Sequence, residues 1–281
     1  GCTAVGYNSL LNNTSGLNTA LGFESLKANT IGNSNTALGY KALTAEVAGD
    51  RNVAVGYQTL VSQTNASTVD AYNVMVGYNA GYSITTGKKN VGVGGLVLDT
   101  VTTGEGNVAM GYNAGTAITT GNNNVAIAIG AYALEANTTA SNNTAVGDKA
   151  LNDNTTGSAN TAMGADAGQS LTTGINSTFL GYAAGESTGT GSYNTFVGFR
   201  CADANTSGQY NVAMGNHALG SNTTAEENTA IGNDAMVDNT TGANNVAVGS
   251  SALANNTTAS ANVAVGRHAL FANTTGDRHV A

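Results

Sequence analysis

A short motif centred on glycine recurs along the whole chain, and this repeat constrains the fold more than any other feature. The motif glycine stands at positions 6, 22, 39, 56, 77, 94, 111, 130, 147, 164, 181, 198, 215, 232, 249 and 266. Twelve of the fifteen steps between these glycines are 17 residues long, and the others are 16, 21 and 19. A fixed period of this length indicates a repeat architecture, in which each repeat packs on its neighbours. We call one repeat a rung and count positions from its glycine.

Each rung contains one short segment with the alternation of a β-strand. Position −3 is almost always β-branched, position −1 is aliphatic, and position −2 is usually Ala. Since successive side chains of a strand point to opposite faces, −3 and −1 share one face and −2 lies on the other. We expect −3 and −1 to fill the core and the Ala column to face outward.

An outward strip of alanines is smooth, apolar and allows close approach of another backbone. Such strips on protein surfaces usually mark an interface, and a cyclic homo-oligomer with the strip on its axis would bury it. The predicted interface residues are Ala20, Ala37, Ala54, Ala109, Ala145, Ala213 and Ala247.

Two corners per rung are also visible in the sequence. Position −4 is usually Asn and position 0 is always Gly, and both residue types adopt left-handed backbone at low cost. A second corner, Thr-Thr-Gly or Thr-Ser-Gly, places its glycine at +10. We expect the Asn column to form a ladder in which side-chain amides bond from rung to rung. The corner and ladder residues are Asn18, Asn35, Asn52, Asn107, Asn143 and Asn211, with Gly22, Gly39, Gly56, Gly111 and Gly147.

Two short segments and two corners in 17 residues predict an all-β fold, a narrow parallel β-solenoid or β-roll. At an inter-strand spacing of about 4.8 Å, the rungs would stack into a rod on the order of 75 Å long. We therefore expect one repeat domain of about 16 rungs over residues 1–281. Because both ends of the sequence fall inside the motif, we expect the chain to be a segment of a longer fibre.

Positions +4 and +7 vary together. Of four rungs with Gly at +4, three carry an aliphatic residue at +7, whereas only one of the eleven rungs with Leu or Met at +4 does so. Since interior volume is costly to lose, we expect both positions to point into one core space and to exchange bulk.

Two rungs break the period. The 21-residue rung 57–77 holds four extra residues in VSQTNASTVDAYN, and insertions in solenoids often form the binding face. Its candidate receptor contacts are Thr64, Asn65, Ser67 and Asp70, although a passive bulge is the favoured interpretation of the insertion. The second break, NNVAIAIG near 124–130, adds two residues and predicts a β-bulge or a strand extension, because an even insertion keeps the in/out alternation.

An aromatic column occupies position +1 in many rungs, with Tyr40, Tyr57 and Tyr78 as its clearest members. These rings are either a stacking platform for a host glycan or structural groups that cover the adjacent glycine.

The sequence offers no constellation for catalysis. No pair of carboxylates recurs in phase, and His217 and His268 lie three rungs apart, too far to share a metal ion. Cys2 and Cys201 stand almost twelve rungs apart, so we expect two small buried thiols and no disulfide. Charged residues make up 9% of the chain with a net charge of −8 and no basic stripe, which argues against a nucleic-acid partner. We expect no enzyme activity, cofactor, metal or direct membrane insertion in this segment.

The motif resembles known fibre repeats. The pattern Asn-Thr/Val-Ala-aliphatic-Gly is similar to the head repeats of trimeric autotransporter adhesins, and the longer form NTALGYKAL…NTTG resembles the repeats of bacteriophage tail-fibre proteins. The resemblance spans essentially all of 1–281, and it implies left-handed β-rolls assembled as an extended homotrimer. The 17-residue period is longer than the adhesin head repeat and favours the phage family.

The resemblance implies a virion tail fibre, an extracellular structure that serves host attachment. Its partners would be two further copies of the chain and a glycan or protein receptor on the host surface. The alternative is a trimeric adhesin on the outer surface of a bacterium. A third possibility is an ice- or surface-binding solenoid with a regular Thr face.

Overall fold

The computed structural model describes residues 1–14 and 16–281, which form two compact units, Gly1–Asn142 (unit 1) and Asn143–Ala281 (unit 2). Both units are all-β, and in each the rungs are turns of a parallel β-solenoid with a spacing of about 17 residues. The predicted fold class is thereby confirmed. Left-handed coiling, trimeric assembly and one continuous domain over 1–281 stay predictions.

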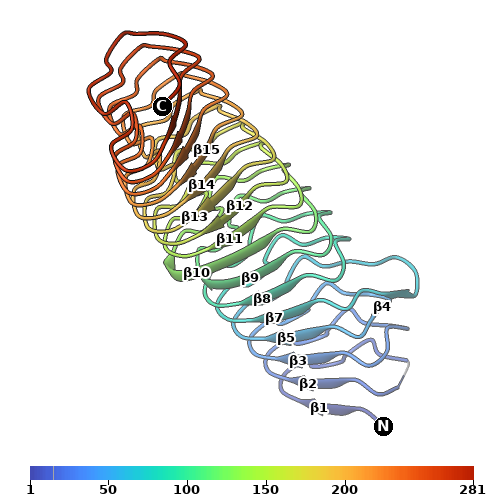
Figure 1. The fold of residues 1–281 in the computed structure, drawn as a ribbon. Coiled ribbons are helices and arrows are strands. Elements are labelled where there is room, and N and C mark those ends of the chain that lie inside the picture. The colour runs from blue at the N-terminus through green and yellow to red at the C-terminus, as the bar shows by residue number, and fades with distance from the viewer. Residues whose placement is uncertain (15) are drawn as a thin grey trace. The chain divides into compact units, whose positions relative to one another are not determined.

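Unit 1 contains one long parallel sheet and one small one (Figure 1). The long sheet comprises β1 (Thr3–Val5), β2 (Thr19–Leu21), β3 (Thr36–Leu38), β5 (Val53–Val55), β7 (Val74–Val76), β8 (Val91–Val93), β9 (Val108–Tyr112) and β10 (Val125–Ala131), in that order. The small sheet pairs β4 (Gly49–Asp50) with β6 (Val69–Asp70). Neighbouring strands pair position with position, as in Ala20↔Ala37, so each repeat position forms a column.

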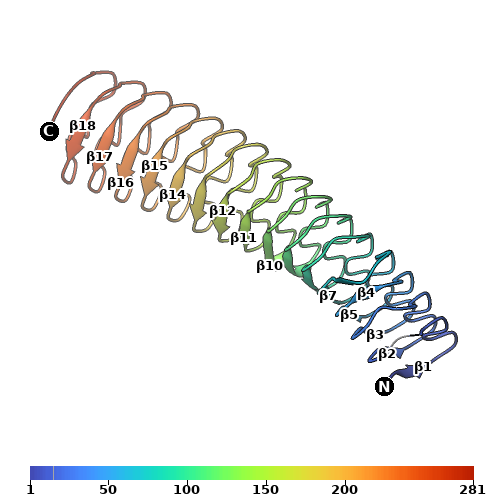
Figure 2. The ribbon, with the colours of Figure 1, turned by 90° about the vertical axis from the view of Figure 1, so that its right-hand side faces the viewer.

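Unit 2 repeats this arrangement without a second sheet among its described strands. Its strands are β11 (Thr144–Val146), β12 (Thr161–Met163), β13 (Thr178–Leu180), β14 (Thr195–Val197), β15 (Val212–Met214), β16 (Thr229–Ile231), β17 (Val246–Val248) and β18 (Val263–Val265). In Figure 2 they lie side by side and run in the same direction.

The Ala column faces the core, so the predicted orientation of the strand was wrong. Ala20, Ala37, Ala54, Ala109, Ala145, Ala213 and Ala247 are all fully buried within the single chain, at most 1% exposed. The −3 and −1 side chains lie on the outer face instead, and Leu21 and Leu38 are 46% and 42% exposed. The alternation itself was predicted correctly, but the two faces were exchanged. The Ala column therefore cannot be an interface between chains.

The reason for the exchange is the narrow interior. The rungs between the first and the last bury positions −2, +3, +4 and +7 together, for example Ala145, Ala150, Leu151 and Asn154. With Leu at +4, the strand opposite has room only for Ala at −2. Where −2 is larger, +4 shrinks: Phe179 is fully buried, and the Cβ of an alanine in place of Gly185, at +4 of the same rung, would collide with its ring.

The exchange of bulk between +4 and +7 is confirmed. Ile118 is fully buried, and its Cδ1 lies 3.0 Å from the point where a Cβ on Gly115 would stand. In the other kind of rung, Leu151 occupies this space and Asn154 stands at +7, again fully buried. The structure extends the rule to position −2, which the sequence analysis had placed outside.

The Asn column at −4 is a buried ladder, as predicted, but its main bonds are to the backbone. The Asn35 Oδ1 accepts the backbone N–H of Asn52 at 2.9 Å, and the same bond recurs in most rungs. Most of the Nδ2 groups donate to the carbonyl at +10 of their own rung, as from Asn35 to Gly49 at 2.8 Å and from Asn228 to Gly242 at 2.9 Å. Direct amide-to-amide bonds also occur, for example from Asn52 to Asn35 at 3.1 Å. The column thus links neighbouring rungs to one another, and it links the corner at −4 to the corner at +10 within a rung.

A second Asn ladder, which the sequence analysis missed, runs along position +7. In unit 2 the Nδ2 of Asn222 donates to the Oδ1 of Asn205 at 2.8 Å, and Asn239, Asn256 and Asn273 continue the series. These amides also donate to the +10 carbonyl. Both ladders therefore converge on the second corner and satisfy it.

The motif glycine is required by backbone contact between rungs. Gly39 has φ = 133°, and a Cβ there would collide with the carbonyl oxygen of Gly56 in the next rung. Any other residue would be strained at this φ and would also push the stacked rungs apart.

The two-residue insertion forms the predicted β-bulge. Ile127 pairs with Met110 and Ala131 pairs with Tyr112, and the register shifts between these two pairs. Gly130 therefore belongs to the bulge, and Ile129 is 73% exposed.

Because positions +4 and +7 share one core space, we expect the effects of substitutions at Gly115 and Ile118 on stability to be coupled. Ile118→Asn should cost about 2–4 kcal/mol, because it removes apolar volume and buries an amide. Gly115→Leu should cost about 1–3 kcal/mol by overpacking. The double variant recreates the pattern of Leu151 and Asn154, so its cost should fall at least about 1 kcal/mol short of the sum.

Denaturant unfolding followed by circular dichroism on the four proteins measures this coupling. The exposed Thr120→Ala serves as the control and should leave stability unchanged within about 0.5 kcal/mol. Costs that add within about 0.5 kcal/mol would show that +4 and +7 do not share space.

Candidate functional site: the insertion loop of unit 1

The 21-residue rung carries a projecting loop, Thr64 to Asp70, which we call the insertion loop. The chain beside β4 reaches further out here than the neighbouring turns do (Figure 1). The tip residues Ala66, Ser67 and Thr68 are exposed. The sequence had predicted a loop at this place, and the structure shows how both of its ends are held.

A buried carboxylate holds the first end of the insertion loop. Glu46 takes the +7 place where most rungs have Asn or an aliphatic residue, and it is fully buried. Its Oε1 accepts the backbone N–H groups of Val47, Ala48 and Gly49 at 2.9, 3.0 and 2.7 Å. The same oxygen accepts the N–H of Asn65 at 3.1 Å, and Oε2 accepts the Asn65 Nδ2 at 2.8 Å. Charge-assisted bonds to five N–H donors compensate the burial of the carboxylate.

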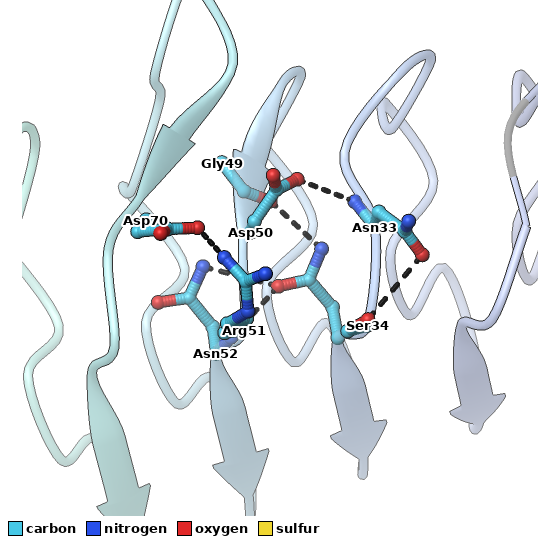
Figure 3. A network of polar contacts seen from close by, with 8 residues as sticks. Asn33, Ser34, Gly49, Asp50, Arg51, Asn52 and Asp70 are labelled. Carbon is cyan, nitrogen blue, oxygen red and sulfur yellow. Dashed lines mark hydrogen bonds and ion pairs between the residues drawn. The ribbon is translucent and has the colours of Figure 1, made fainter.

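The small sheet holds the second end. Val69 and Asp70 of β6 pair with Gly49 and Asp50 of β4, and the Arg51 guanidinium forms an ion pair with Asp70 (Figure 3). Arg51 also lies over the ring of Tyr72, 5.5 Å from its centroid.

The network continues into the preceding rung, where Asp50 Oδ1 accepts the backbone N–H of Asn33 at 2.7 Å (Figure 3). The loop is therefore fixed at both ends, while its tip stays in solvent.

Beside the loop lies a shallow surface hollow of about 320 Å³, which we call the loop hollow. The insertion loop forms one wall, and the second corners of the next two rungs form the floor. Its lining residues are Asn65, Ala66, Ser67, Val69, Thr86, Lys88, Thr103 and Glu105. Lys88 Nζ and Glu105 Oε1 lie 4.0 Å apart at its edge, so the lining carries no net charge.

The predicted receptor contacts in the insertion play different parts. Ser67 lines the loop hollow, and Thr64 is exposed beside it. Asn65 is only 4% exposed, and its amide is bonded to Glu46. Asp70 is exposed but paired with Arg51. Asn65 and Asp70 are therefore groups that position the loop, and Ser67 is the polar residue in the predicted set that both lines the hollow and has an exposed side chain.

The aromatic column of unit 1 is a continuous stack from Tyr7 to Tyr78. The ring centroids of Tyr40 and Tyr57 lie 5.1 Å apart with an interplanar angle of 9°, and Tyr57 and Tyr78 stack at 5.4 Å. Phe23 covers the other face of Tyr40 at 5.3 Å. Because neighbouring rings cover both faces of Tyr40 and Tyr57, these two residues present edges to solvent, which supports the structural interpretation over a glycan platform.

The thiols differ from one another. Cys201 takes a +3 place in the core, where burial raises the pKa of its thiol to about 12. Cys2 is exposed, so the prediction of two buried thiols was wrong for this residue. Cys201 stays protonated at neutral pH and is no nucleophile.

Within residues 1–14 and 16–281, no group of three or more His, Cys, Asp or Glu side chains is placed to hold a metal ion. Nor does this part of the chain contain a helix with the length and apolar character needed to cross a membrane.

A second, smaller hollow of about 230 Å³ lies on unit 2. It is open where Gly220 provides no side chain between Asp203 and Val237, and its other lining residues are Arg200, His217 and Ser221. The Arg200 Nε bonds to Asp203 Oδ2 at 2.8 Å, so the two charges at its edge already satisfy each other.

The chain was compared with protein-family models, curated proteins and solved structures, and none of these comparisons gives a match.

We expect the anchoring of the insertion loop to depend on the charge of Glu46. Glu46→Gln replaces an acceptor oxygen by an amide group that faces the N–H donors, and the chain should lose about 1.5–3 kcal/mol of unfolding free energy. The control Glu227→Gln, at an exposed site of unit 2, should change stability by less than about 0.5 kcal/mol. Denaturant unfolding gives both values, and equal effects of the two substitutions would contradict the anchoring role.

Proposed function

We propose that this chain is a structural fibre protein, the repetitive part of a phage tail fibre, which assembles as a homotrimer and serves host attachment. The mechanism is non-enzymatic. The solenoid units act as a rigid scaffold, and recognition belongs to the places where the repeat is interrupted. Three chains would multiply weak individual contacts by avidity.

The observation that carries this proposal is the apolar outer face of the long sheets. In both units the aliphatic side chains at −1 form a column that the single chain leaves open to solvent. Apart from Ile129 in the bulge, which is 73% exposed, its most exposed members are 37–60% exposed: Val5, Leu21, Leu38, Val93, Met110, Met163, Leu180, Met214, Ile231 and Val265. Contiguous apolar surface of this kind marks an interaction site or an aggregation hazard.

The composition of this face supports association between copies of the chain. Positions −3 and −1 hold no charged residue in any rung. Because every rung presents the same pattern, a second copy in the same register would meet matching side chains along the whole length of each sheet. The interface that we propose thus consists of the −1 column with its −3 neighbours, in place of the buried Ala column.

A trimeric adhesin on a bacterial surface would use the same geometry and is our second candidate. A monomer would favour the third candidate, a surface-binding solenoid, because the outer face also carries a column of half-exposed threonines at −3. This column includes Thr144, Thr161, Thr178 and Thr195.

Light scattering coupled to size-exclusion chromatography tests the proposal directly. We expect a mass of about 84 kDa, which corresponds to three chains of 27.9 kDa. Leu180→Asp places a charge on the outer face and should shift the protein toward the monomer, since an unpaired charge in an apolar interface is costly. The control Thr173→Asp lies on an exposed corner of the same unit and should keep the wild-type mass. A wild-type mass near 28 kDa would overturn the homotrimer.

A further inference from the structure

We propose that the loop hollow of unit 1 is a saccharide site that binds a neutral sugar through adjacent hydroxyl groups. A neutral sugar would be the class of ligand recognised in host attachment, so this inference rests on the proposed function. It depends on three features of the described residues: unused hydroxyl groups, a balanced pair of charges, and a rigid wall.

The first feature is the set of hydroxyls that line the hollow. At position +8, the Thr85 and Thr102 hydroxyls donate to carbonyls of the next rung at 3.1 and 3.3 Å. The +9 hydroxyls of Thr86 and Thr103 have no such bond among the described residues, and neither has Ser67 of the loop. Each hydroxyl donates one hydrogen bond and accepts two, which matches the hydroxyl groups of a sugar.

The second feature is the charge balance. Lys88 and Glu105 occupy the same position, +11, on successive rungs, and their charged atoms lie 4.0 Å apart. An ammonium donor beside a carboxylate acceptor suits two neighbouring hydroxyls of one sugar ring, of which one accepts and the other donates. Because the two charges cancel, the hollow has no electrostatic preference for an anionic ligand.

The third feature is the rigid wall. On the other rungs the +9 threonines stand on an open ridge, for instance Thr156 and Thr173 of unit 2, which are exposed. At Thr86 and Thr103 the insertion loop converts this ridge into a hollow, and Glu46 and the β4–β6 pair hold the loop in place. A site whose wall is already ordered loses little conformational entropy on binding.

The size of the hollow fits a small ligand. Its volume of about 320 Å³ lies at the lower end of the roughly 300–1,000 Å³ found for small-molecule sites. The site is open and polar, so its affinity for a single sugar is weak, and copies of the site on one assembly would raise the effective affinity.

Saturation-transfer difference NMR on the full chain tests this inference. The probes are the methyl glycosides of glucose, galactose, mannose and N-acetylglucosamine, with glucuronic acid as the anionic probe. We expect a saturable signal from at least one neutral glycoside. The double variant Thr86→Ala/Thr103→Ala should weaken this binding at least fivefold, and Glu105→Gln should weaken it as well.

The matched control is Thr156→Ala/Thr173→Ala, which removes the same hydroxyls at the same position of unit 2 and should leave binding unchanged. The inference is overturned if no neutral glycoside gives a saturable signal, if both double variants bind alike, or if glucuronic acid alone binds. The oligomeric mass is measured on the same samples. A trimer that binds no sugar would overturn the saccharide site and leave the fibre proposal standing. A monomer would overturn the fibre proposal, whatever the result of the sugar-binding measurement.

Discussion

In most rungs, the hydrogen bonds of the Asn at −4 determine the dimensions of the rung. Its Oδ1 accepts the backbone N–H of the equivalent Asn in the next rung, as from Asn52 to Asn35 at 2.9 Å. Its Nδ2 donates across the rung to the carbonyl at +10, as from Asn143 to Gly157 at 2.9 Å. One buried side chain thus sets the rise between rungs and also draws the two corners of its own rung together. An amide is suited to this task because it donates and accepts at the same time.

The narrow interior follows from these bonds, and the apolar outer face follows from the narrow interior. With the corners held together, a rung has space for one large side chain opposite the strand, so position −2 is limited to Ala unless +4 gives up its volume. The larger aliphatic residues of the strand are left on the outside. A single chain therefore satisfies its buried amides but leaves a long apolar surface uncovered, which is the physical basis of the proposed association.

The sequence predicted the solenoid, its period, the corner residues and the exchange of bulk between +4 and +7, because each of these depends on spacing alone. It did not predict which face of the strand is buried, since the usual rule that larger apolar residues lie inside assumes a core wide enough to hold them. A signal was present nevertheless: Phe179, with Gly185 at +4 of its rung, shows that −2 shares volume with +4. Glu46 was also missed, although it is the one acid at +7 and stands directly before the 21-residue rung.

The five methionines test the central claim most directly, because the structure divides them between the two faces. Met75 and Met236 are fully buried in the core, whereas Met110, Met163 and Met214 at −1 are 42–45% exposed in the single chain. Peptide mass spectrometry after brief peroxide treatment should find all five protected in the assembled protein. After dissociation of the folded chains by Leu180→Asp, the three outer methionines alone should oxidise. Rapid oxidation of Met110, Met163 and Met214 in the assembled protein, or of Met75 and Met236 in the folded chain, would contradict the account.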